Sequence, residues 1–366
     1  MEIKNTPLKL TNERPWRTYL GGSLLDALHG QKGLPDGHFP EEWIASVTVS
    51  KAAQLSSSSR EGLSRLKSCQ TTTLKDLLEN EPASYLGAKH AQRFGGELGV
   101  LVKLIDSAER LSVQAHPDRA KAAEFFATPY GKTECWHILE TRAINGQTPC
   151  VYLGFRPGVS REDWEKLFAQ QDVPGMLACL HRFAARPGDT FFVEGGVPHA
   201  IGAGCFLVEI QEPTDFTFRL DRITPSGFEL SEEMCHQGIG FAKMFDCFHY
   251  EGFSKEETQK RWLIPPRLLN RQSGGTVTSL IGYETTPFFQ MNLLECAGTL
   301  TVSLPEAFSG LYILAGEGAL AANGDEQPAS SGEQFFLPAL TGEFILKPSP
   351  GQTIKAMHFF GPLSSD

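Results

Sequence analysis

One stretch of the sequence, LSVQAHPDRAKAAEFFATPYGKTECW over residues 111–136, constrains the fold more than any other. Apolar and polar residues alternate over 111–116, which predicts a strand that the following proline ends. Side chains two residues apart share a face of a strand, so Gln114 and His116 are predicted to point the same way. A short helix is expected next, over 119–126.

A second strand is predicted over 132–138, where Lys132 and Glu134 share one face. The two strands together offer an amide oxygen, an imidazole and a carboxylate that converge on one point. Ligands of this kind suit Zn²⁺ or a similar divalent ion. A four-coordinate site still needs one more ligand.

The remaining ligand is expected in residues 186–202, RPGDTFFVEGGVPHAIG, where two turns enclose a short strand. His199 follows the second turn, at the start of another strand. The spacing of these glycines, the proline and His199 resembles the second half-motif of the cupin barrels, in which the histidine binds a metal.

Taken together, LSVQAHPD, GKTECW, RPGD, VPHAIG and DFTFRLDR resemble the type I phosphomannose isomerases, in their short form. The resemblance covers most of residues 10–225. It implies a zinc-dependent aldose–ketose isomerase that interconverts mannose 6-phosphate and fructose 6-phosphate through a cis-enediol. It also implies one Zn²⁺ per chain, held by Gln114, His116, Glu134 and His199.

The same resemblance implies roles for five further residues. Asp215 and Arg219, which a strand would present on one face, are expected to be catalytic, with Arg219 on the oxyanion or the phosphate. Lys132 is the third expected catalytic residue, and the predicted substrate-binding residues are Lys103 and Ser112.

The identity of the general base stays open at this point. Long-form relatives have a histidine where this chain has Gly131, so a role for that histidine does not transfer. The candidates are Lys132, Asp215 and His116, each of which carries a titratable side chain.

The predicted fold is mainly β, a double cupin of jelly-roll-like barrels with short peripheral helices. Residues 1–255 are expected to form the metal-binding catalytic domain. Its helical annex, over about 158–184, has a helix after Ser160 and a second over 175–183, and is expected to cover one end of the substrate cleft. Residues 256–366 are expected to form a degenerate cupin-like domain without metal, in which His358 is isolated.

Composition limits the partners. A formal net charge of −10 argues against nucleic acid, and a phosphate substrate would need a local cluster of Lys and Arg. No run approaches the ~18 apolar residues of a membrane span. Eight cysteines without paired spacing indicate reduced thiols and a cytoplasmic protein, expected to be a monomer or small homo-oligomer.

Three other functions remain compatible with these residues. A related cupin isomerase could act on a different sugar or sugar phosphate, and a metallo-cupin could bind a sugar without converting it. His116, Glu134 and His199 could also form the two-histidine, one-carboxylate set of a non-haem iron site. Gln114 as a fourth ligand favours zinc.

Overall fold

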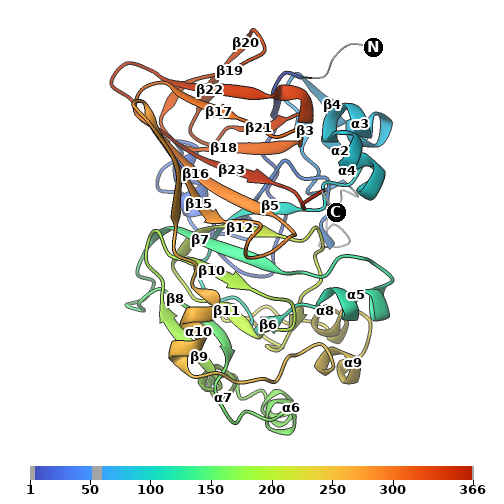
Figure 1. The fold of residues 1–366 in the computed structure, drawn as a ribbon. Coiled ribbons are helices and arrows are strands. Elements are labelled where there is room, and N and C mark those ends of the chain that lie inside the picture. Colours follow the sequence, from blue (N-terminus) through green and yellow to red (C-terminus); the bar gives the residue numbers. More distant parts are fainter. Residues whose placement is uncertain (1–4, 52–59, 365–366) are drawn as a thin grey trace.

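The computed structural model describes residues 5–51 and 60–364 of the chain (Figure 1). Its strands are β1 (Leu8–Leu10), β2 (Glu41–Ile44), β3 (Arg65–Leu66), β4 (Cys69–Thr73), β5 (Leu101–Asp106), β6 (Gln114–Ala115), β7 (Glu134–Thr141), β8 (Cys150–Phe155), β9 (Leu180–Ala184), β10 (Thr190–Val193), β11 (His199–Ile201), β12 (Cys205–Gln211), β13 (Phe218–Arg219), β14 (Arg267–Gln272), β15 (Gly275–Ile281), β16 (Gln290–Cys296), β17 (Leu300–Ser303), β18 (Ser309–Ala315), β19 (Glu317–Ala322), β20 (Asp325–Ser330), β21 (Gln334–Leu337), β22 (Glu343–Pro348) and β23 (Ile354–Phe360).

Short helices connect these strands. They are α1 (Ser23–Leu28), α2 (Leu74–Asn80), α3 (Pro82–Leu86), α4 (Ala88–Phe94), α5 (Arg119–Phe126), α6 (Arg161–Gln170), α7 (Val173–Ala178), α8 (Glu232–His236), α9 (Phe241–Phe245), α10 (Lys255–Trp262) and the 3₁₀ turn η2 (Ala339–Thr341).

Four sheets lie one above another and form two barrels (Figure 1). The β7 sheet (β10-β7-β12-β5-β2) faces the β11 sheet (β13-β6-β11-β8-β9) in the first barrel. The nine-stranded β18 sheet (β14-β15-β16-β23-β18-β21-β1-β3-β4) faces the β19 sheet (β17-β22-β19-β20) in the second. The predicted mainly β, double-cupin fold is confirmed.

The β18 sheet is covered on both faces, and strand alternation explains how. Along β23, Ile354 and Ala356 enter the core of the second barrel, whereas Met357 and Phe359 enter the core shared with the β7 sheet. The two barrels therefore pack through a continuous apolar layer.

The nine-stranded sheet draws strands from both sides of the predicted boundary at residue 255. β1, β3 and β4, from the N-terminal part, extend the sheet whose other strands follow residue 255. The two-domain division by residue number stays a prediction, and the sheet itself combines both segments.

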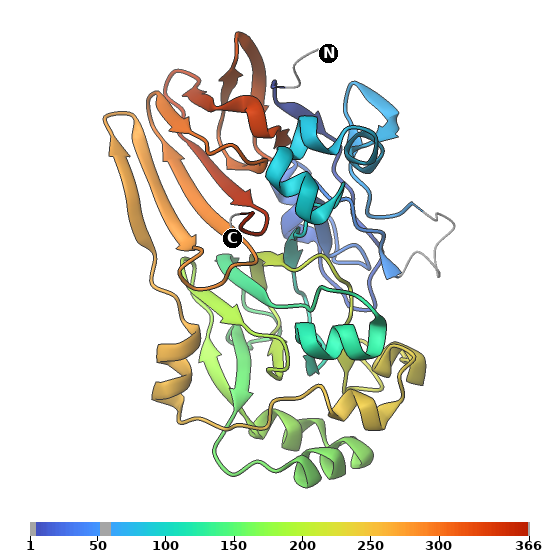
Figure 2. The same ribbon diagram turned by 45° about the vertical axis from the view of Figure 1, so that its right-hand side comes forward.

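Helices cover the outer face of the β11 sheet (Figure 2). Ser160 caps α6 by accepting from the amide of Asp163, and Trp164 and Phe168 turn into the apolar cluster beneath. The predicted helix over 175–183 is wrong in its second half, because α7 ends at Ala178 and 180–184 forms strand β9. Hydrogen bonds from β8 to β9 outweigh the local helical pattern.

Among the described residues, no helix is long and apolar enough to cross a membrane.

Candidate functional site

Three predicted metal ligands meet between the two sheets of the first barrel. The ligand atoms of His116, Glu134 and His199 all lie within 4.8 Å of one another, and all three residues are buried. His116 directly follows β6, Glu134 begins β7 and His199 begins β11. The facing sheets thus bring together residues that are 83 positions apart at most.

Backbone carbonyls orient both imidazoles. Nδ1 of His116 lies 2.8 Å from the Phe216 carbonyl oxygen, and Nδ1 of His199 lies 2.9 Å from that of Val197. Each Nδ1 therefore donates its proton, so each Nε2 carries a lone pair that can bind a metal. The two Nε2 atoms lie 3.2 and 3.3 Å from the carboxylate oxygens of Glu134.

Gln114 completes the group. Its side-chain amide lies 3.2 Å from Nε2 of His199, on the strand that pairs with β11. The amide oxygen and nitrogen exchange places on a half-turn of the side chain, so the oxygen can face the same point as the imidazoles. The four predicted ligands therefore lie together, and their role as ligands stays a prediction.

The chemistry of this group fits a divalent cation. Glu134 Oε1 is buried and has no hydrogen-bond partner among the described residues. Burial lowers the pKa of His116 to about 4, with the Lys132 charge acting in the same direction, so the imidazole is neutral. Two neutral imidazoles and a carboxylate form a common zinc set.

Lys132 lies beside the ligands. Its ammonium is 2.9 Å from Nε2 of His116 and also donates to Oε2 of Glu134. Burial by itself would raise the pKa of Glu134, but the Lys132 charge together with His116 and His199 outweighs it and holds that pKa well below its ordinary value. Glu134 is consequently an anion that a metal cation can bind.

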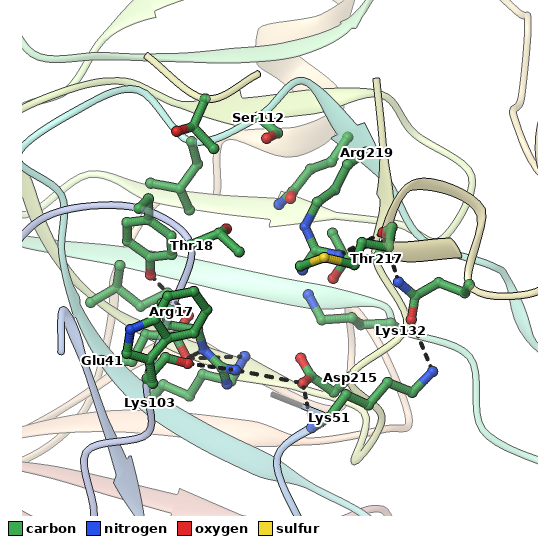
Figure 3. A pocket seen from close by; sticks show the side chains of 18 of the residues that line it. Arg17, Thr18, Glu41, Lys51, Lys103, Ser112, Lys132, Asp215, Thr217 and Arg219 are labelled. Carbon is green, nitrogen blue, oxygen red and sulfur yellow. Dashed lines mark hydrogen bonds and ion pairs between the residues drawn. The ribbon is translucent and has the colours of Figure 1, made fainter. Parts of the chain in front are cut away.

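A pocket of about 340 Å³ adjoins this cluster and reaches it through Gln114 and Lys132 (Figure 3). Its lining contains six basic and four acidic side chains, in contrast to the net charge of −10 of the whole chain. The charged lining residues are Arg17, Lys51, Lys103, Arg110, Lys132, Arg219, Glu41, Glu209, Asp215 and Glu233. The predicted substrate residue Ser112 also lines it.

Arg219 is a cation of this pocket with no ion pair within 4 Å among the described residues. It pairs in register with Gln114, and its Nη1 donates to the carbonyl oxygens of Met234 (2.9 Å) and Thr217 (3.4 Å). Figure 3 shows the guanidinium of Arg219 and the ammonium of Lys132 turned into the same space. Both cations are therefore available to oxygen atoms of a ligand beside the metal cluster.

Asp215 lies on another wall of the pocket, where its carboxylate accepts from the backbone amide of Lys51 at 3.2 Å. Burial would raise the pKa of Asp215, but the charges of Arg17, Lys103 and Arg219 outweigh it and hold the pKa far below the ordinary value. Asp215 is thus ionised at neutral pH, and it is a weak proton acceptor.

Lys103 lines the pocket within an ion-pair network. Its ammonium lies 3.0 Å from Glu209 and 4.0 Å from Glu41, and it is 3% exposed. Cross-strand pairing of β5 with β12 places Lys103 directly opposite Glu209. Because these carboxylates already neutralise Lys103, it is less available to a phosphate than sequence reasoning suggested.

Sequence reasoning missed three basic residues of the pocket, Arg17, Lys51 and Arg110. Arg110 is paired with Asp221 at 2.8 Å. Lys51 donates to Gln237 at 2.9 Å and lies 4.0 Å over the Phe216 ring. Arg17 is buried against Glu41, and its Nη2 has no hydrogen-bond partner among the described residues. The sequence feature that could have indicated Arg17 is its position directly after the Pro15-Trp16 pair.

Close packing of the backbone explains why position 131 is a glycine. A Cβ at this position would lie 2.8 Å from the Pro117 carbonyl oxygen and 2.9 Å from the Arg119 nitrogen. The loops before β7 and after β6 thus approach too closely for a histidine at position 131. The role of that long-form histidine therefore does not transfer to position 131.

The annex of residues 158–184 does not cover the pocket as predicted. None of its residues lines the pocket; α8 and the segment before it contribute Ser231, Glu233 and Met234 instead. The annex packs on the opposite face of the β11 sheet, because its apolar side chains join the cluster there.

Two segments of the chain match known family models. Residues 58–133 match the model described as phosphomannose isomerase type I, catalytic domain. Residues 280–356 match the model described as mannose-6-phosphate isomerase, cupin domain.

Individual proteins agree with these matches. The mannose-6-phosphate isomerase of Streptococcus mutans is 26% identical over 77% of this chain and 78% of its own length. The crystal structure of the mannose 6-phosphate isomerase from Bacillus subtilis aligns with a TM-score of 0.70 at 23% identity, over 97% of this chain and 99% of that one. A zinc-bound mannose 6-phosphate isomerase structure aligns with a TM-score of 0.71 at 16% identity, over 98% and 100%. Both alignments show that the fold of this chain resembles the folds of those two structures.

Proposed function

We propose that this chain, a type I phosphomannose isomerase, interconverts mannose 6-phosphate and fructose 6-phosphate through a cis-enediol, with one Zn²⁺ bound. The observation that carries the proposal is the convergence of both Nε2 atoms on the buried carboxylate of Glu134 at the wall of a basic pocket. A metal cluster without this pocket would be compatible with many reactions.

Gln114, His116, Glu134 and His199 would hold the zinc ion. When bound, the ion supplies Lewis-acid polarisation of a carbonyl or hydroxyl oxygen next to it, which makes the neighbouring C–H more acidic. Isomerisation also needs residues that bind the oxygens, bind the phosphate and move one proton between C1 and C2.

Arg219 is our candidate for the oxygens of the reacting carbons. It lies beside Gln114 in the sheet register, and among the residues that the structure describes its guanidinium has carbonyl partners only. Preorganised donors at a developing oxyanion commonly contribute ~3–4 kcal/mol to catalysis.

Lys132 is our candidate for proton transfer, because it belongs to both the metal cluster and the pocket lining. Asp215 is ionised and surrounded by cations, so we assign it the role of holding Lys51 and Arg17 toward the pocket. Lys51 is our candidate for the phosphate, because its ammonium lines the pocket and is held over the Phe216 ring.

A coupled assay on chelator-treated protein tests the proposal. Activity on mannose 6-phosphate should vanish on metal removal and return with one equivalent of Zn²⁺, while D-mannose should react far more slowly. Equal turnover of D-mannose would favour a different sugar substrate. Zinc binding without turnover of either sugar would favour a non-catalytic sugar-binding cupin.

A further inference from the structure

A second cavity, of about 640 Å³, lies in the second barrel and is lined by none of the residues of the first pocket. Five strands contribute lining residues: β14, β15, β16 and β23 of the β18 sheet, and β17 of the facing β19 sheet. Its size is within the range of small-molecule sites, ~300–1,000 Å³. Its polar and aromatic lining residues include Asn270, Gln272, Tyr283, Gln290, Asn292, Thr301, Ser303, His358 and Phe360.

His358 is the feature of this cavity that needs an explanation. It is 1% exposed, and neither Nδ1 nor Nε2 has a hydrogen-bond partner among the described residues. The rings of Phe344 and Phe360 flank it, with centroids 5.3 and 4.5 Å away. A buried polar atom without a partner costs about 1–3 kcal/mol, so two on one ring indicate that something in the cavity bonds them.

The imidazole of His358 is neutral, because burial lowers its pKa to about 3. It therefore presents one N–H donor and one lone-pair acceptor. A hydroxyl group is the simplest partner that can meet either atom, since it both donates and accepts.

The side chains beside His358 have the same dual character. Asn292 is its direct cross-strand partner and is 4% exposed, and its Oδ1 accepts from Gln290 Nε2 at 3.3 Å. This bond uses neither the Nδ2 donors of Asn292 nor the Oε1 acceptor of Gln290, so these atoms can bond a ligand. The aromatic ring of Phe360 adds an apolar surface on the same strand as His358.

Charge excludes an ionic ligand. The only charged residues in the lining of this cavity, as far as the structure describes the chain, are Lys89 and Glu306, which have opposite signs. A single imidazole with amides and hydroxyls is also a poor set for a metal ion. The lining of the first pocket, in contrast, contains six basic residues.

We propose that the second-barrel cavity binds a small uncharged polyhydroxylated molecule, of the neutral monosaccharide or polyol class, through His358, Asn292 and Gln290. Vicinal hydroxyls would bond the amides and the imidazole, and the apolar face of the molecule would lie on Phe360. The site is distinct from the first pocket and independent of the function proposed there.

Histidine ring signals in the NMR spectrum of the zinc-bound protein test this proposal. Mannose 6-phosphate is kept at saturation so that the first pocket stays occupied, and D-mannose or D-sorbitol is then added. The ring signals of His358, assigned with His358→Gln, should shift in a saturable way with a Kd in the millimolar range or below. Those of His181, a buried histidine that bonds the Phe253 carbonyl, should not move.

Two variants provide a matched pair. Asn292→Leu should weaken D-mannose binding at least about tenfold, because it removes one polar contact. Met357→Leu, on the same strand but facing the other core, should leave the affinity within about twofold because the exchange conserves volume.

Three results would overturn the proposal. One is the absence of any His358 shift up to about 100 mM of either polyol, which would leave water as the occupant. The others are a shift caused by Zn²⁺ alone and a shift caused by inorganic phosphate alone, since either would identify an ionic site.

Discussion

Replacing Arg219 with alanine separates two roles for this residue, because a phosphate contact and an oxyanion contact affect different kinetic constants. Within the described part of the chain, the guanidinium has two carbonyl partners, both on Nη1, so its other nitrogens can form a pair of charge-assisted bonds to a ligand. Each such bond contributes about 1.5–3 kcal/mol. The pair amounts to about 3–6 kcal/mol, or roughly 10²–10⁴-fold in kcat/KM.

We expect this loss to appear in kcat, because Arg219 lies beside Gln114 at the metal cluster. An interaction made only in the transition state lowers kcat and kcat/KM equally. The coupled assay would be run on mannose 6-phosphate with Arg219→Ala, Arg219→Lys and a control, Arg222→Ala. Arg222 packs on Phe168 and Phe241 and does not line the pocket.

Arg222→Ala should retain activity within about twofold, and Arg219→Lys should recover part of the loss, since a lysine lacks the fork of donors. A rise in KM at constant kcat for Arg219→Ala would refute the reasoning and would indicate that Arg219 binds the phosphate instead. Unchanged zinc content in all three variants excludes an indirect effect through the metal.

Three further predictions use other parts of the molecule. Partial burial lowers the pKa of Lys51 to about 8, so Lys51 should lose its positive charge as pH rises through about 8. The kcat/KM for mannose 6-phosphate should decline over the same range, and Lys51→Arg should flatten that decline in a pH–rate profile. Glu134→Gln should weaken zinc binding by about 100-fold or more in a chelator competition, and Glu140→Gln, at an exposed position of the same strand, should not change it. Asp106→Ala removes the acceptor of the buried amide of Gly22 (2.9 Å) and of the partly buried amide of Leu24 (2.8 Å). Urea unfolding should therefore show a loss of about 2–5 kcal/mol in the free energy of unfolding, and a loss under about 1 kcal/mol would contradict this account.

Local signals were sufficient where one segment determines its own structure. The predicted helix over 119–126 is α5, because Asp118 caps it by accepting from the Lys121 amide and no strand competes for those residues. The helix predicted over 175–183 failed in its second half, since Leu180–Ala184 pairs with β8 across the sheet. Pairing with a distant strand leaves no periodic signal in the segment itself.

The candidate site divides in the same way. Gln114, His116, Glu134 and His199 sit in motifs with characteristic spacing, so the sequence indicates them without a structure. Lys51 is a single basic residue with no motif, and only the fold brings it over Phe216. His358 looks isolated in the sequence for a related reason, because its cross-strand neighbour Asn292 comes from another strand.

The pairing of β1 with β21 has a consequence for how the chain folds. Residue for residue, Leu8–Leu10 lie against Gln334–Phe336, and Lys9 also bonds the Pro328 carbonyl, 319 positions along the chain. During synthesis, the N-terminal strand must therefore wait for almost the whole chain before its partner emerges from the ribosome. Closing so long a loop raises contact order and slows folding. Meanwhile the unpaired strand edge is open to pairing with other chains, which makes the yield of native protein depend on concentration and temperature.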